Sequence, residues 1–191
     1  MPVLNVRHCF TAPHFRTPSG LRACIRVLCC ALALIALLGA PASHAQVENG
    51  TRFKDWMVRC ETGEDAGGKQ VEVCYIFQRL VLKDGKRPVL EVSVGYMRND
   101  SQPAAFFTVP LGVTLPTGMQ IQIDAGKAIR IPFAYCRDTG CVAPMQLENS
   151  VLGRFKNGNV ATVTFVDGLG QQVPVPVSLQ GFTAGFNALK P

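Results

Sequence analysis

The sequence predicts an all-β fold: an antiparallel β-sandwich or small barrel with one or two short helices, the last at the C-terminus. Three observations support this prediction. Short segments alternate between apolar and polar side chains, as half-buried strands do. Turns rich in proline and glycine separate these segments at regular intervals. Helical spacing of apolar residues is confined to two short stretches, around residues 148–156 and 179–189.

Residues 1–45 have the features of a cleavable export signal. An apolar run over residues 27–40 follows a basic region without acidic residues, and Ser43-His-Ala45 resembles a cleavage site. The basic residues are Arg7, Arg16, Arg22 and Arg26. We therefore predict a mature single β domain over residues 46–191, with no stable transmembrane segment after cleavage. An uncleaved anchor is the alternative, but the apolar run is short for a membrane span.

Removal of this leader changes the chemistry available to the chain. Four of the 19 basic residues and none of the 13 acidic residues lie in it, which leaves residues 46–191 with a net charge of +2. So small a charge does not favour nucleic acid or anionic lipid as a partner. The histidines, His8, His14 and His44, all lie in the leader, which excludes histidine-dependent catalysis and histidine metal sites from the exported form.

Four cysteines remain in the mature chain: Cys60, Cys74, Cys136 and Cys141. An even number of cysteines in an exported chain indicates disulfides. Three connectivities exist, and proximity in the sequence favours Cys60–Cys74 and Cys136–Cys141. For the second pair, a redox role or a metal site is the alternative. The four intervening residues, Arg-Asp-Thr-Gly, are typical of a turn and favour a structural bond.

Each expected element follows from its local pattern. The first strand places Trp56, Val58 and Cys60 on the core side, and a polar loop over residues 61–70 separates it from the second, so that the Cys60–Cys74 disulfide would close the base of a hairpin. The expected strands cover residues 53–60, 71–82, 88–97, 104–109, 119–124, 127–135, 142–147, 160–166 and 173–179. The turns between them include an Asp-Gly turn over residues 83–88 and a loop over residues 99–103.

The second half of the chain contains the most regular pattern. Pro110 and Pro116 bound a short predicted strand, and a glycine turn leads from it into residues 119–124. In the segment 127–135, Ile129, Ile131, Phe133 and Tyr135 are expected on one face. A helical turn over residues 148–156 should stop at Asn157-Gly158. Two prolines suit the strand 173–179 to a sheet edge, and Leu179, Phe182, Phe186 and Leu189 would line one face of a closing helix.

No catalytic, cofactor-binding or metal-binding residue is predicted. The segment Gly63–Lys69 resembles a phosphate-binding loop, but Gln70 replaces the required Ser or Thr and the flanking elements are strands. No serine lies in a nucleophile motif. Phe106, Phe107 and Phe133 could line a ligand pocket, although a place in the core is favoured. The carboxylates are scattered, and a paired acid–base site among them stays open.

The order and spacing of several short motifs resemble those of the invasion-associated locus B family of Gram-negative bacteria. The motifs are Trp56-Met-Val-Arg-Cys60, Cys74-Tyr-Ile-Phe-Gln78, Pro110-Leu-Gly-Val-Thr-Leu-Pro-Thr-Gly-Met119 with Ile123-Asp124, Cys136-Arg-Asp-Thr-Gly-Cys141 with Ala143, and Ser178-Leu-Gln-Gly-Phe182 with Leu189. The resemblance implies an exported envelope protein, periplasmic or surface-associated, in a family named for a link to host-cell invasion. The family has no established catalytic residues.

Three hypotheses of function follow. The first is a non-enzymatic protein of the cell envelope that acts by contact with an envelope or host protein, without a cofactor. The second is a periplasmic module that binds a small apolar or glycan ligand between its β layers. The third is an enzyme that uses carboxylates alone. The sequence places the functional surface on loops such as 61–70 or 137–140.

Overall fold

The computed structural model describes residues 47–64, 67–81, 87–97 and 101–189. They belong to one compact unit, Gln46–Pro191. The predicted export signal, most of the Asp-Gly turn and residues 99–100 of the predicted loop lie outside the described residues. Within the described ranges, no helix combines the length and apolarity that crossing a bilayer requires.

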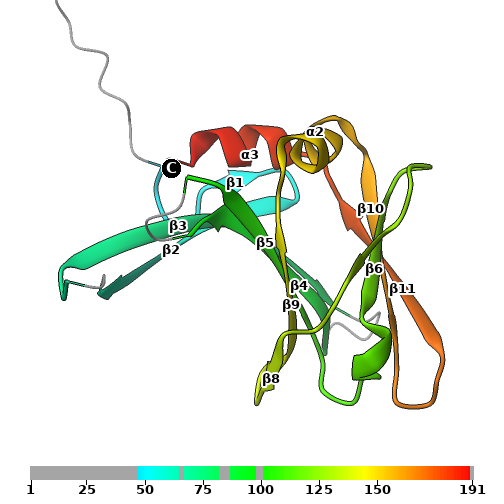
Figure 1. Cartoon of the computed structure of the whole chain (residues 1–191). Helices are drawn as coiled ribbons and strands as arrows, with labels where there is room; N and C mark the ends of the chain where they lie inside the picture. The colour runs from blue at the N-terminus through cyan, green and yellow to red at the C-terminus, as the bar shows by residue number, and fades with distance from the viewer. Residues whose placement is uncertain (1–46, 65–66, 82–86, 98–100, 190–191) are drawn as a thin grey trace, which may run out of the picture. The chain divides into compact units, whose positions relative to one another are not determined.

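The fold consists mostly of strands in two antiparallel sheets, with two short helices, as predicted (Figure 1). The large sheet has the order β1-β2-β3-β4-β5-β9-β8 and the small sheet β11-β10-β6-β7, so the described strands form two open sheets and no closed barrel. The large-sheet strands are β1 Arg52–Phe53, β2 Trp56–Glu64, β3 Gln70–Val81, β4 Pro88–Tyr96, β5 Pro103–Val109, β8 Tyr135–Arg137 and β9 Gly140–Gln146. The small-sheet strands are β6 Met119–Ile123, β7 Ile129–Ile131, β10 Val160–Val166 and β11 Gln172–Ser178.

One face of each sheet contributes to a single shared core. In the large sheet, Ile76, Val94 and Ala105 are cross-strand neighbours and are fully buried. In the small sheet, Val163 lies between Ile121 on β6 and Val175 on β11, and all three side chains are buried. All belong to one contiguous apolar cluster, which is the arrangement expected of two sheets that pack face to face.

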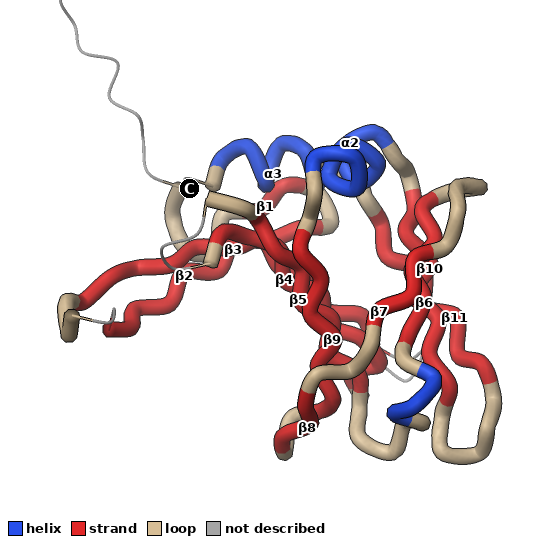
Figure 2. Tube along the Cα trace, viewed as in Figure 1, coloured by secondary structure: helices blue, strands red, loops and turns tan. Residues whose placement is uncertain are grey.

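The helices cover one end of the two sheets (Figure 2). They are α2, Asn149–Asn157, and α3, Phe182–Ala188, and a single 3₁₀ turn, η1, spans Leu115–Thr117. The ring of Phe182 packs edge-on against Trp56, with 5.3 Å between ring centroids, and its other neighbours are Phe155 and Phe186. These aromatic contacts attach both helices to the large sheet, because Trp56 begins β2.

The first predicted strand, 53–60, and the polar loop 61–70 are corrected by the structure. The chain reverses at Lys54, whose φ is +53°, so that Phe53 pairs with Trp56 across a tight turn. β2 then continues to Glu64, and its ladder with β3 includes residues that were expected to form a loop. Cys60 lies opposite Cys74 in the middle of this ladder, not at its base. The hairpin extends away from the rest of the sheet, where polar residues can face water on both sides (Figure 1).

Two further predicted strands differ from the structure. The segment 127–135 is divided at Pro132: β7 ends at Ile131 in the small sheet, and the chain then crosses to the large sheet, where Tyr135 begins β8. Proline has no N–H to donate, which ends the ladder there. Ile131 and Tyr135 therefore do not share a face. Between Pro110 and Pro116, the expected strand is reduced to a single bridge from Val113 to Asp167 and the turn η1.

A polar cross-link joins the two sheets inside the core. Gln78 on β3 is the one buried polar side chain among the described residues, at 8% exposure. Its amide nitrogen donates to the carbonyl of Ser178 on β11 at 3.1 Å, and its amide oxygen accepts from the Ser178 N–H at 3.3 Å. The indole N–H of Trp56 donates to the same carbonyl at 2.9 Å. Side chains of the large sheet thus form hydrogen bonds with the backbone of β11.

Candidate functional site

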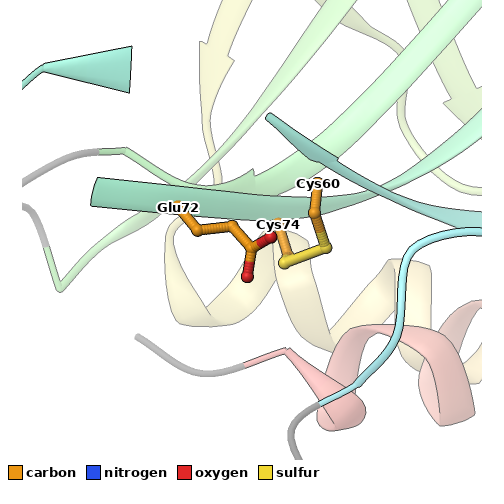
Figure 3. Close-up of side chains that lie close together, drawn as sticks. All are labelled: Cys60, Glu72 and Cys74. Carbon is orange, nitrogen blue, oxygen red and sulfur yellow. A yellow bond between two sulfur atoms is a disulfide. The ribbon is translucent and has the colours of Figure 1, made fainter. Parts of the chain in front are cut away.

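The two disulfides join Cys60 to Cys74 and Cys136 to Cys141, the pairing that proximity in the sequence favours. Glu72 lies beside the first disulfide, with its carboxylate and both sulfur atoms within 4.8 Å of one another (Figure 3). Metal ions are bound by thiolates, whereas these sulfur atoms are bonded to each other. In this state the group is a cross-strand disulfide next to a carboxylate.

The outer faces of the two sheets, which point away from the shared core, differ in chemistry. The small sheet presents polar side chains there, among them Gln120 paired with Thr164 and Gln122 paired with Thr162. Neither glutamine is buried, whereas the alternate residues of β6 are. This is an ordinary solvated face, and it is the reference against which the large sheet is compared.

The large sheet presents aromatic and apolar side chains on the side that points away from the core. Unless the small sheet is named, "the outer face" means this side of the large sheet. Its side chains stand in cross-strand rows that follow from the strand register. The rows are Glu61 and Val73; Arg59, Tyr75, Gly95, Ala104 and Gln146; Met57, Phe77, Ser93, Phe106 and Pro144; and Arg79, Glu91, Thr108, Val142 and Tyr135. Aromatic, methionine and arginine residues of this kind are enriched at protein interfaces.

Arginine side chains lie over the aromatic rings of the outer face. The guanidinium groups of Arg59 and Arg79 lie 4.9 Å and 5.9 Å from the centre of the Phe77 ring. Arg79 also forms an ion pair with Glu91 at 2.5 Å. At the far side of the sheet, Arg137 lies 4.9 Å from the centre of the Tyr135 ring. Such cation–π contacts hold the guanidinium groups against the aromatic rings of this face.

Tyr75 and Glu61 form a second polar pair on this face. The Tyr75 hydroxyl donates to the Glu61 carboxylate at 2.5 Å. Burial, followed by this hydrogen bond and the charge of Glu61, raises the pKa of Tyr75 to about 12. Arg59 opposes the shift through its own charge and a hydrogen bond with the same hydroxyl. The phenol is therefore held neutral as a fixed donor to the carboxylate.

A hollow of about 430 Å³ opens on the outer face between β2 and β5. Its lining residues include Glu61, Tyr75, Gly95, Met97 and Phe106, and Gly95 lies directly opposite Tyr75 in the ladder of β3 and β4. A Cβ atom at Gly95 would lie 2.8 Å from the Cβ atom of Tyr75, so a side chain there would displace this ring. The hollow exists because the strand carries no side chain at this point.

The candidate residues from the sequence are distributed over different parts of the fold. Phe107 is fully buried and Phe133 is partly buried against the core, as the core interpretation expects, whereas Phe106 lines the hollow. From the expected functional loops, Glu61 lines this hollow, and Asp138 lines a second hollow of about 420 Å³ between β4, β5 and the β8–β9 turn. Residues 65–66 of the first loop lie outside the described ranges.

Several carboxylates stabilise the fold directly. Asp55 accepts a hydrogen bond from the Ser178 hydroxyl at 2.6 Å. Asp124 accepts from the backbone N–H groups of Asn159 and Val160, at the start of β10. With Glu91 bound to Arg79, these carboxylates have separate partners in separate parts of the molecule. They do not form the converging pair that a carboxylate-only enzyme needs.

We expect the Tyr75→Phe variant to lose the tyrosinate signal with a pKa of about 12, as followed by ultraviolet absorbance during alkaline titration. The folded-state pKa exceeds that of an unfolded tyrosine, about 10. The contribution of the protonated Tyr75 side chain to the stability of the folded state is therefore complete below about pH 10, and it is lost as the pH rises toward 12. In Glu61→Gln the same signal should move to lower pH, because the charge is removed while burial remains. An unchanged signal in both variants would contradict the Tyr75–Glu61 pair.

Comparison with known proteins agrees with this fold. An invasion protein B homologue from Brucella abortus strain 2308 is 23% identical over 171 residues, which cover 86% of this chain and 95% of the relative. A homologue from strain 9-941 of biovar 1 matches to the same extent. The crystal structure of invasion associated protein B from Bartonella henselae has a TM-score of 0.61 at 21% identity, over 72% of this chain and 91% of that one.

The family assignment rests on a match to nearly the whole described domain. The model of the Invasion associated locus B (IalB) protein family matches residues 56–190. These residues include both disulfides, the two helices and every strand of the two sheets except β1. The chain therefore belongs to the invasion associated locus B family.

Proposed function

We propose that this protein is an exported, non-enzymatic component of the cell envelope that acts by protein–protein contact through the outer face of its large sheet. The curated relatives are described as invasion protein B homologues, which supports a role in contact with other proteins. Disulfides persist in oxidising compartments, which supports export to the periplasm or the outer surface of a Gram-negative bacterium.

One observation carries this proposal: the outer face of the large sheet carries several aromatic side chains, while the equivalent face of the described small-sheet strands carries none and presents glutamine and threonine side chains along β6 and β10. Met97 beside the hollow and Tyr135 at the far side of the sheet are 48% and 45% exposed. Exposed apolar surface surrounded by polar groups is typical of interaction sites. Since only one of the two outer faces has this composition, we assign the contact to that face.

Site-specific photo-cross-linking in cells is expected to locate the contact. A photoreactive amino acid at Met97 or Tyr135 should give a discrete adduct with an envelope or host protein. The same amino acid at Val160 or Leu169 should give none, although these apolar side chains of the small-sheet region are 39% and 84% exposed. The exposures of the two control positions lie below and above those of the two test positions, so the comparison isolates the face.

A second measurement connects the adduct to function. The double variant Met97→Ser, Tyr135→Ser should lose the adduct and the cell-envelope or host-contact phenotype of a deletion strain. The control double variant Val160→Ser, Leu169→Ser should keep both. Equal adducts from the two faces, or a phenotype that follows the control variant, would contradict the proposal.

Binding of a small ligand is the second candidate, and the hollow beside Tyr75 favours it. The sequence placed such a ligand between the two layers, but that space is filled by the core cluster, and the hollow lies on the outer face instead. A purified protein that carries a tightly bound small molecule, detected by native mass spectrometry, would favour this candidate over protein contact.

A further inference from the structure

We propose that the hollow on the outer face takes the side chain of a lysine from the partner protein. The inference rests on the proposed function, because it names the group by which the partner would be held. Three features of the hollow carry it: a carboxylate among its lining residues, a hydrogen bond that already engages one oxygen of that carboxylate, and an apolar floor of suitable form.

Among the described residues that line the hollow, Glu61 is the one with a carboxylate or basic side chain. The other described lining residues are apolar or aromatic, apart from Ser93. A carboxylate beside aromatic walls attracts a cation, both by direct charge attraction and through the ring faces of residues such as Tyr75.

The Glu61 carboxylate is exposed, and its Oε1 atom accepts a hydrogen bond from the Tyr75 hydroxyl. The two arginines of this face have other partners: Arg59 lies over the Phe77 ring and is hydrogen bonded to the Tyr75 hydroxyl, and Arg79 forms an ion pair with Glu91.

The Tyr75 hydroxyl on Oε1 favours lysine over arginine. A guanidinium binds a carboxylate best with two parallel hydrogen bonds, one to each oxygen atom, so it would share Oε1 with this hydroxyl. A lysine ammonium is compact and needs one. The long unbranched stem of lysine can also lie along apolar surface while its charge reaches a polar rim. Gly95, beside Tyr75, provides part of this surface, and Phe106 also lines the hollow.

The test uses a free analogue of the lysine side chain. The isotopically labelled chain is titrated with n-butylammonium, n-butanol, n-butyrate and tetramethylammonium, and amide shifts are followed by NMR. We expect n-butylammonium to shift the amides of Tyr75, Gly95 and Phe106, and to bind about fivefold more tightly than n-butanol, as for one exposed cation contact. n-Butyrate should bind more weakly still.

Two carboxylate variants make the test specific. Glu61→Gln should abolish the preference for n-butylammonium over n-butanol, whereas Glu91→Gln, which removes another carboxylate from the same face, should retain it. Shifts at other residues, an equal affinity for n-butanol or n-butyrate, or an unchanged preference in Glu61→Gln would each overturn the proposal. Tighter binding of tetramethylammonium would overturn it in favour of a quaternary lipid headgroup.

The result of this titration can be separated from the result of the cross-linking experiment that tests the proposed function. If n-butylammonium does not bind while the cross-link at Met97 still forms, the outer face is the contact surface and the lysine assignment is wrong. If n-butylammonium binds at the hollow and neither face gives a cross-link, the hollow is a cation site and the protein-contact proposal is wrong.

Discussion

Replacing Gly181 by alanine is expected to lower the free energy of unfolding by about 4 kcal/mol. Gly181 precedes α3 with a φ of +87°. A Cβ atom there would overlap the carbonyl oxygen of Phe53 and lie 2.6 Å from its carbon. This backbone belongs to the turn between β1 and β2 and cannot move without separating α3 from the sheet. The loss includes the contact of Phe182 with Trp56.

The matched control for this substitution is Gly170→Ala. Gly170 also has a positive φ, +79°, but a Cβ atom there would meet nothing within 4 Å. Only the backbone conformation is penalised, so we expect a loss of about 1 kcal/mol. Thermal and denaturant unfolding of both variants measure the difference. Similar losses in the two variants would show that α3 can shift and that its approach to β1 is not tightly constrained.

The strands and helices could be predicted where the pattern is local. β10 lies at the predicted residues 160–166, because Ala161, Val163 and Phe165 alternate with threonines and the core takes every second residue. Pro174 and Pro176 indicated an edge strand, and β11 is at the edge of the small sheet. α2 ends at Asn157, before the glycine that predicted its end.

The reversal at Lys54 could not be predicted, because the groups that stabilise it are distant in the sequence. The backbone N–H of Asp55 donates to the carbonyl of Gln180, and its carboxylate accepts from the Ser178 hydroxyl. A pattern within residues 53–60 contains no information about these partners. Residues 53–60 are therefore predicted as one continuous strand, because the turn depends on contacts with the C-terminal segment.

The outer face was missed for a related reason. An alternating strand is expected to have one buried and one solvated face, so the functional surface was expected on loops instead. The sequence of β3 does carry a signal, since Tyr75, Ile76 and Phe77 are consecutive apolar residues and must occupy both faces. The position of Arg59 over Phe77 could not be predicted, because it depends on the register of β2 against β3.

Replacing Gln78 by glutamate is expected to destabilise the protein by about 3 kcal/mol at neutral pH. The amide of Gln78 donates to the carbonyls of Asp55 and Ser178 and accepts from the Ser178 N–H. An ionised glutamate of the same shape can only accept. It would leave both carbonyls without this donor and would place a negative charge beside them in the core.

The loss should depend on pH in a defined direction. Burial next to carbonyl oxygens raises the pKa of the introduced carboxyl above its unfolded value, about 4.3. The protonated form can donate to one carbonyl and accept from the N–H, as the amide does. Stability relative to the natural protein should thus be highest below the unfolded pKa and fall as the pH rises through the folded one. Glutamine does not titrate, so the difference between the two proteins isolates this group.

Denaturant unfolding of both proteins between about pH 5 and about pH 8 measures this dependence. The control is Gln120→Glu on the polar outer face of the small sheet, where the expected change is below about 0.5 kcal/mol. A deficit in Gln78→Glu that is as small as this, or that does not shrink toward low pH, would mean that apolar contact alone holds the sheets together. The expected deficit would instead show that one amide aligns β11 with the large sheet, and with it the C-terminal segment that fixes the turn at Lys54.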